Sequence, residues 1–205
     1  MRNVGVTTIA TFLLLSSSGC SGLMLEHLYS SSRDVWQQPD AVIQSLSIPP
    51  DARVADLGAG GGYFTFRLAE AVGPQGRVYA VDIDRDDLQD IAQRAPKQGF
   101  ANVTVVQASE ADPRLPESSV DLIFTCNTVH HLENRVDYFR SAGHYLRQDG
   151  RIAIIDYLPI GFAWLFGHGT AKEQIRREMG AAGYYLTDEF DYLPKQHFQV
   201  FRRKE

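Results

Sequence analysis

Cysteine is scarce in this sequence, which has only Cys20 and Cys126 among its 205 residues. Two cysteines do not make a disulfide framework, so a hydrophobic core must hold the fold. Cys126 ends an apolar run that begins at Leu122, and a cysteine in such a run is expected to act as a small core residue. The length suits one domain with a core of its own.

An excess of positive charge is also missing. The formal net charge is −5, and the 20 Lys and Arg residues are scattered along the chain. Because nucleic-acid-binding proteins usually carry a basic patch, we expect no nucleic-acid partner. His130 and His131 have no companion ligands at metal-binding spacing, so we expect no metal site.

The first 22 residues differ from the rest of the chain. Arg2 precedes an uncharged, mostly apolar stretch at residues 4–15, and small residues lead to Cys20. This order is typical of a secretory signal peptide. Residues 18–20 resemble the end of a bacterial lipoprotein signal, although Ser17 stands where that pattern usually has Leu. We therefore expect residues 1–22 to be an export segment and residues 23–205 to form the domain.

The resemblance implies that Cys20 is lipidated. It predicts an exported protein that is anchored in the membrane through this residue and faces the periplasm. Two alternatives stay open. One is a secretory signal without lipidation, and the other is a true start at Met24, which predicts a cytoplasmic protein and keeps every later motif.

From Arg53 onward, short apolar segments alternate with amphipathic ones. Strands are predicted at residues 53–57, 78–81, 103–107, 120–126 and 151–156, helices at residues 63–72, 86–98, 135–147 and 171–182, and a closing antiparallel pair at residues 184–193 and 196–202. Strands separated by helices indicate a parallel sheet. Continuous apolar strands indicate burial on both faces, and right-handed crossovers then give a doubly wound α/β sandwich.

Polar residues gather at the predicted strand ends. Asp56, Asp82, Asn127 and Asp156 each end a predicted strand or follow it directly. In sheets of this type, ligands bind at the carboxyl ends of the strands. The sequence therefore predicts a binding crevice at that edge.

Four glycines, at positions 58, 60, 61 and 62, follow the first strand and open a helix. Glycine permits sharp turns and lets a ligand approach the backbone closely. A dinucleotide fingerprint G-x-G-x-x-G would need a third glycine where Tyr63 stands, so a nicotinamide oxidoreductase is disfavoured. The pattern is instead G-x-G-x-G, preceded by Asp56.

Residues 54–65 and 78–84 resemble the first two motifs of class I S-adenosylmethionine-dependent methyltransferases. Residues 115–123, 130–132 and 146–156 resemble the later motifs of the UbiE-like and small-molecule branch. The resemblance covers about residues 33 to 202. It implies a Rossmann-like doubly wound sheet, mostly parallel with an antiparallel C-terminal strand. It also implies S-adenosyl-L-methionine as cofactor and a small-molecule or lipid-like methyl acceptor.

The resemblance also implies cofactor contacts. Asp82 would accept the ribose hydroxyls, Ile83 would pack on the adenine, and Asp56 would contact the methionine side. Asn127 would lie beside the methionine end. The backbone of the glycine loop completes the predicted cofactor set with Gly58, Gly60 and Gly62.

The residues that would contact the adenine and the methyl acceptor follow the family pattern less closely. Many family members have Gly-Asp after the third strand, whereas this chain has Ala108 followed by Ser109 and Glu110, either of which is a candidate for the adenine contact. His131 and Asp156 are the predicted catalytic residues. For the histidine, a hydrogen-bonding or packing role is the alternative. The apolar segment 162–166 is interpreted as a lid, a membrane-facing patch or core.

Two functional hypotheses remain. The first is an enzyme that methylates a small molecule. The second is a non-catalytic lipoprotein of methyltransferase fold that binds S-adenosylmethionine or a nucleotide. The second stays open because S-adenosylmethionine is made in the cytoplasm, which leaves an exported enzyme without an evident supply.

The anchor hypothesis predicts that Cys20→Ser releases the protein from membranes, because serine cannot carry the thioether-linked lipid. Fractionation of cells that express each form measures this. An unchanged membrane fraction for the variant would remove the lipoprotein hypothesis.

Overall fold

The computed structural model describes residues 33–159 and 169–204. The chain divides into two compact units, residues 1–35 and 36–205, and the fold below is that of the second unit. The predicted export segment 1–22 and the apolar segment 162–166 lie outside the described residues. Within the described part, no helix is both long enough and apolar enough to cross a membrane.

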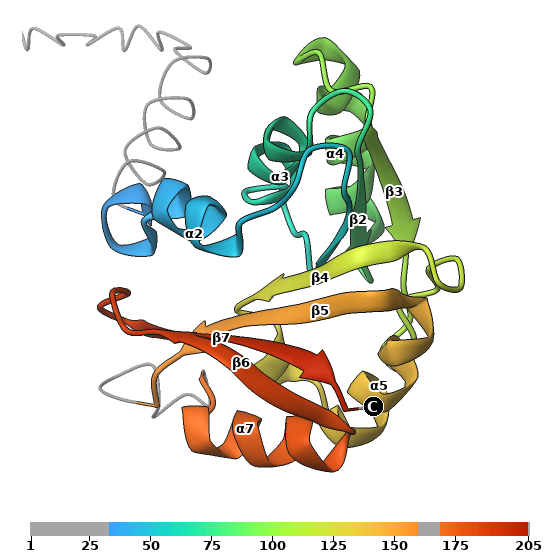
Figure 1. The fold of residues 1–205 in the computed structure, drawn as a ribbon. Coiled ribbons are helices and arrows are strands. Elements are labelled where there is room, and N and C mark those ends of the chain that lie inside the picture. The colour runs from blue at the N-terminus through green and yellow to red at the C-terminus, as the bar shows by residue number, and fades with distance from the viewer. Residues whose placement is uncertain (1–32, 160–168, 205) are drawn as a thin grey trace, which may run out of the picture. The chain divides into compact units, whose positions relative to one another are not determined.

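One sheet of seven strands organises this unit, in the order β3-β2-β1-β4-β5-β7-β6 (Figure 1). In chain order the strands are β1 Arg53–Leu57, β2 Arg77–Asp82, β3 Val103–Gln107, β4 Val120–Cys126, β5 Leu146–Tyr157, β6 Tyr184–Phe190 and β7 Gln196–Arg203. The pairs β1–β2, β1–β4, β2–β3 and β4–β5 are parallel. β7 runs antiparallel to both β5 and β6, which confirms the predicted fold class.

Helices cover both faces of the sheet. The core on one face joins α2 Pro39–Leu46, α3 Thr65–Val72 and α4 Arg85–Lys97 to the strands, and the core on the other face contains α5 Arg135–Ala142 and α7 Lys172–Ala181. The four-residue spacing of Leu68 and Val72 explains α3, because both side chains are buried on the face turned to the sheet. At α4, the Asp84 carboxylate accepts the backbone N–H groups of Asp86 and Asp87 and so begins the helix.

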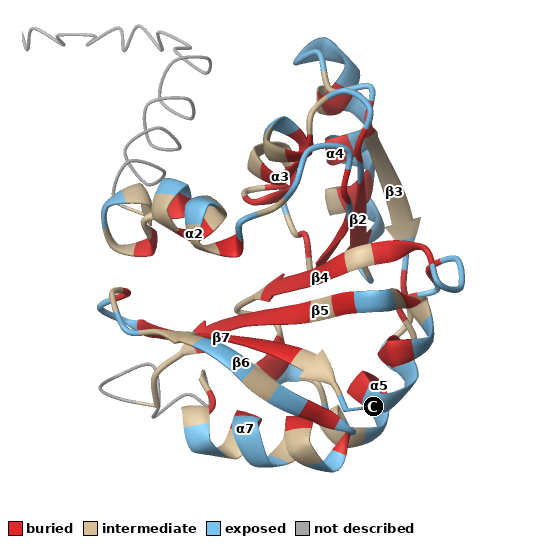
Figure 2. Ribbon diagram, viewed as in Figure 1, coloured by how far each residue is buried: buried red, intermediate tan, exposed pale blue. Residues whose placement is uncertain are grey.

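The central strands carry the core. β4 and β5 are largely buried, whereas the edge strand β3 is only half-buried (Figure 2). Phe124 of β4 is fully buried, and its ring packs edge-on against Phe64 with 4.8 Å between centroids. This contact ties the start of α3 to the middle of the sheet.

The sequence prediction is wrong between α5 and β5. A helix was expected over residues 135–147, but α5 ends at Ala142, a 3₁₀ turn spans Gly143–Tyr145, and β5 begins at Leu146. Leu146 pairs with Val120, and the register then shifts so that Arg151 pairs with Leu122. The residues between Leu146 and Arg151 form a bulge in β5 that includes Gly150. Because these residues have no apolar pattern, the sequence did not predict the first part of the strand.

We predict that Phe124→Ala lowers the free energy of unfolding by about 3–5 kcal/mol, because it removes a fully buried ring from the centre of the sheet. Urea denaturation measures the loss. Tyr185→Ala is the control, since that side chain is 48% exposed and its removal should cost about 0.5 kcal/mol. Equal losses in the two variants would contradict the assignment of the core.

Candidate functional site

The glycine loop follows β1 and turns the chain through three left-handed residues. Gly58, Gly60 and Gly62 have φ values of +76°, +47° and +80°. A Cβ at Gly58 would lie 2.0 Å from Oγ1 of Thr128, which is too close for any side chain. The loop after β1 and the loop after β4 therefore meet at a point where only glycine fits.

Asp82 ends β2 beside this loop. Its Oδ2 accepts the N–H of Gly60 at 2.8 Å, and its Oδ1 accepts the N–H of Asp84 at 3.0 Å. The carboxylate is thus held in one orientation by two backbone donors, and each oxygen keeps a further lone pair. The next residue, Ile83, is 57% exposed, which is unusual for a large apolar side chain.

A cavity of about 690 Å³ opens at this edge of the sheet. Its wall is built from the ends of β1 and β2, the segment after β3, and the segment from Thr128 into α5. The lining residues are Leu57, Gly58, Val81, Asp82, Ile83, Ala108, Ser109, Glu110, Ala111, Thr128, His131, Leu132, Glu133, Asn134, Asp137, Tyr138 and Ser141.

The lining of this cavity is acidic. Asp82, Glu110, Glu133 and Asp137 contribute carboxylates, and no Lys or Arg stands among the described residues of the wall. Burial raises the pKa of Tyr138, so its phenol stays neutral near pH 7. A cavity lined in this way favours a ligand that carries positive charge.

The structure brings together part of the predicted site. The residues predicted to form the site and found in the cavity wall are Gly58, Asp82, Ile83, Ser109, Glu110 and His131. The predicted residues outside that wall are Asp56, Gly60, Gly62, Asn127 and Asp156. Among this second group, Gly60 and Gly62 shape the loop, while the polar side chains are held by other protein groups.

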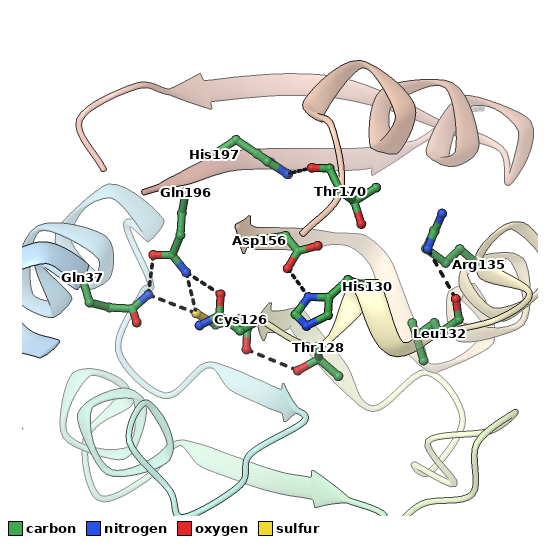
Figure 3. Close-up of polar contacts among 11 residues, drawn as sticks. Gln37, Cys126, Thr128, His130, Leu132, Arg135, Asp156, Thr170, Gln196 and His197 are labelled. Carbon is green, nitrogen blue, oxygen red and sulfur yellow. Dashed lines mark hydrogen bonds and ion pairs between the residues drawn. The ribbon is translucent and has the colours of Figure 1, made fainter. Parts of the chain in front are cut away.

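Asp56 and Asn127 both contact neighbouring side chains. Asp56 is buried, and its Oδ2 accepts the hydroxyl proton of Thr65 at 2.6 Å, which fixes the first turn of α3. Asn127 has a φ of +60°, and its Oδ1 accepts an N–H of Gln196 at 2.5 Å. Gln196 in turn accepts from Gln37 at 2.7 Å (Figure 3). These contacts orient both residues beneath the loops that surround the cavity.

His130 lies between the two predicted catalytic residues. Its Nδ1 is 2.7 Å from Oδ1 of Asp156, a fully buried residue of β5 (Figure 3). Its ring centroid is 4.1 Å from that of His131, which lines the cavity. Both histidines belong to the 3₁₀ turn Val129–His131, where adjacent side chains point in different directions. The sequence pattern did not distinguish the two histidines, so it did not predict that His130 contacts both Asp156 and His131.

Ser109 is turned toward its own loop. Its backbone pairs with Asp112 in an isolated bridge, and its hydroxyl donates to the Asp112 carbonyl at 3.4 Å. The Asp112 carboxylate accepts the phenol proton of Tyr145 at 2.6 Å, and this hydrogen bond lowers the pKa of Asp112. Asp112 was not predicted, and its contacts make it a residue that shapes the loop below Glu110.

A second cavity, of about 450 Å³, lies at the opposite edge of the sheet. Arg151 and Arg202 line it, but Arg151 donates to the carbonyls of Leu46 and Ser47, where α2 ends, and Arg202 donates to the carbonyl of Asp149. The guanidinium groups of both arginines are thus used to hydrogen-bond backbone carbonyls of the protein itself. Since ligands in sheets of this type bind at the carboxyl ends of the strands, the cavity at that edge is the candidate site.

Comparisons with known proteins agree with this geometry. A family model described as a methyltransferase domain matches residues 48–191, so the chain belongs to that family. Aklanonic acid methyltransferase DauC of Streptomyces sp. (strain C5) is 32% identical over 101 residues, which are 49% of this chain and 46% of that protein. The ubiquinone/menaquinone biosynthesis C-methyltransferase UbiE of Ectopseudomonas mendocina (strain ymp) is 27% identical over 140 residues, which are 68% of this chain and 54% of that protein. The chain spans about half the length of the curated relatives it matches.

Solved structures show the same fold. A crystal structure of a SAM-dependent methyltransferase from Aquifex aeolicus superposes with a TM-score of 0.75 at 22% identity, covering 87% of this chain and 96% of that one. Family and neighbours imply S-adenosylmethionine as the cofactor. The residues fit it: Gly58 brings the loop backbone to the cavity wall without a side chain, Asp82 is oriented at that wall, and Ile83 offers an apolar surface there.

We predict that Gly58→Ala abolishes cofactor binding and lowers the melting temperature, because the added Cβ collides with Thr128 at a φ where side chains are strained. Gly61→Ala is the matched control, since a Cβ there meets nothing within 4 Å. Thermal melts and calorimetry measure both effects. A Gly58→Ala protein that melts and binds like the Gly61→Ala protein would contradict the close approach of the two loops.

Proposed function

We propose that this chain is an S-adenosylmethionine-dependent methyltransferase that acts on a small-molecule or lipid-like acceptor. The observation that carries the proposal is the cavity at the carboxyl edge of the sheet. It unites the glycine loop, an oriented carboxylate and an exposed apolar side chain on three neighbouring segments.

Each part of the wall has a role in the proposal. The second lone pairs of the Asp82 oxygens accept the ribose hydroxyls, and Ile83 packs on the adenine. Glu110 or Ser109 meets the adenine edge. S-adenosylmethionine supplies a methyl group on a positively charged sulfur, and the acidic wall favours that charge.

On the acceptor side, the protein acts mainly by positioning. His131 contacts the acceptor from the cavity wall, and Asp156 acts through His130 rather than by touching the acceptor, because its side chain is fully buried. The names of relatives such as DauC and the nocamycin O-methyltransferase of Saccharothrix syringae support a small-molecule acceptor.

A binding protein without turnover is the second candidate. The orientation of Ser109 favours it, since the hydroxyl donates within its own loop instead of toward an adenine. Methyl transfer to a trial acceptor distinguishes the candidates. The lipid anchor at Cys20 is a separate proposal that rests on the sequence of residues 1–22 alone.

We predict that Asp82→Ala weakens S-adenosylmethionine binding at least tenfold, or about 1.4 kcal/mol, because the ribose loses its acceptor and the Gly60 N–H loses its partner. Calorimetry on purified protein measures the affinity. Asp86→Ala is the control, since this exposed carboxylate lies outside the cavity wall. The absence of cofactor binding by the unmodified protein would overturn the proposed function.

A further inference from the structure

Arg94 of α4 extends to the glycine loop. Its Nη2 donates to the carbonyl oxygen of Gly61, which lies 33 residues earlier in the chain. Its Nε forms an ion pair with Asp90 of the same helix, at 2.7 Å from Oδ2. The guanidinium also lies over the ring of Phe66, with Cζ 5.0 Å from the ring centroid. One planar group therefore contacts α4, the glycine loop and α3 at the same time.

The two halves of the glycine loop are held in different ways. The first half is fixed to β2, because the carbonyl of Val81 accepts two of its N–H groups and Asp82 accepts a third. In the second half, Gly61 is exposed, and a Cβ at this position would meet nothing within 4 Å. The conformation at Gly61 therefore depends on hydrogen bonds of the backbone and not on packing.

Two hydrogen bonds hold the peptide group that joins Gly61 to Gly62. Its C=O accepts from Arg94, and its N–H donates to the carbonyl of Ala59 at 2.9 Å. A trans peptide directs these two groups in opposite directions, so its plane cannot rotate unless one of the bonds breaks. Glycines have the widest choice of φ and ψ, and a peptide between two of them is therefore easily turned when a bond is missing.

We propose that Arg94 is a positioning residue for the cofactor site, because it fixes this peptide and so keeps the glycine loop in the conformation that binds the cofactor. Arg94 is not among the residues of the cavity wall, whereas Gly58 of the loop is. Arg94 therefore acts through the loop. A loop that is already ordered loses less conformational entropy when a ligand binds. The inference rests on the proposed function, since it takes S-adenosylmethionine as the ligand.

The three contacts of this side chain require an arginine. The exposed fractions are 35% for Arg94 and 56% for Asp90, so their ion pair adds little stability by itself. The pair uses Nε, which leaves Nη2 for the carbonyl of Gly61 while the flat face covers Phe66. A lysine has one ammonium nitrogen and no flat face, and it cannot make all three contacts together.

The charge of Arg94 and its hydrogen bond to the loop predict opposite effects on binding. The sulfur of S-adenosylmethionine is positively charged, and a cation near the site disfavours it. If charge were the only influence of Arg94, its removal would strengthen cofactor binding. Loss of the hydrogen bond to Gly61 instead predicts weaker binding. The direction of the change in affinity therefore distinguishes the two effects.

Calorimetry with S-adenosylmethionine measures this direction. Arg94→Ala should weaken binding about tenfold, and Arg94→Lys, which keeps the charge, should weaken it about threefold. Lys97→Ala is the matched control, because it removes an exposed positive charge from the last turn of the same helix. Its affinity should stay within about twofold of the original. In turnover, the KM for the cofactor should rise with the loss of affinity while kcat changes by about twofold at most, since the bound cofactor orders the loop.

Amide hydrogen exchange without cofactor tests the fixed peptide directly. The N–H of Gly62 should exchange about tenfold faster in Arg94→Ala than in the unmodified protein, because its peptide plane is then held at one end only. The N–H of Leu68, which donates to the carbonyl of Phe64 at the start of α3, should exchange at the same rate in both proteins and controls for general loss of stability.

Unchanged exchange at Gly62 in Arg94→Ala would overturn the proposal, as would equal or tighter cofactor binding by this variant. If Arg94→Ala does not fold, the same two measurements on Arg94→Lys decide, and values equal to those of the unmodified protein overturn the proposal. The proposed function fails separately. Missing cofactor binding by the unmodified protein overturns the enzyme and leaves Arg94 to the exchange at Gly62, whereas normal binding with unchanged exchange overturns the role of Arg94 only.

Discussion

The pairing of β1 with both β2 and β4 is the constraint on which the rest of the site depends. β1 lies at the point where the chain order of the sheet reverses, since β2 and β3 continue to one side and β4 and β5 to the other. The loops after β1 and β4 must therefore leave the same edge in different directions, which opens a crevice between them. Gly58 and Thr128 meet at this point, so the width of the crevice is set by a contact that excludes a side chain.

The two aspartates Asp56 and Asp156 show what burial does to residues at strand ends. Both end strands at the carboxyl edge, where a sequence pattern predicts ligand contact, and both are buried against a side chain of the protein. A buried carboxylate needs donors, and Thr65 and His130 supply them. These residues act on the cavity through the groups they hold, namely the start of α3 and the histidine turn.

Much of the fold could be predicted from sequence because it follows local rules. The strands 53–57, 103–107 and 120–126 have the bounds that their continuous apolar runs predict. The end of α5 could not be predicted in this way. Residues up to Arg147 continue a helical pattern, but residues 143–145 form a 3₁₀ turn and β5 begins at Leu146, which pairs with Val120. A tertiary contact overrode a local preference there.

The same division runs through the site. On the cofactor side, the backbone itself imposes the residue types. Positive φ values favour glycine in the loop, and the carboxylate of Asp82 at the end of β2 accepts the N–H of Gly60. Five of the nine predicted cofactor residues accordingly line the cavity.

On the acceptor side, orientation depends on side chains that are distant in sequence. Gln37 reaches Gln196 across 159 residues, and Gln196 in turn holds Asn127. His130 is placed by Asp156, and Asp156 lies beside His197 only because β7 runs antiparallel to β5. No local spacing encodes these contacts, which is why the sequence selected His131 and Asp156 but not the histidine between them. The antiparallel strand that closes the sheet therefore also completes the polar network behind the cavity.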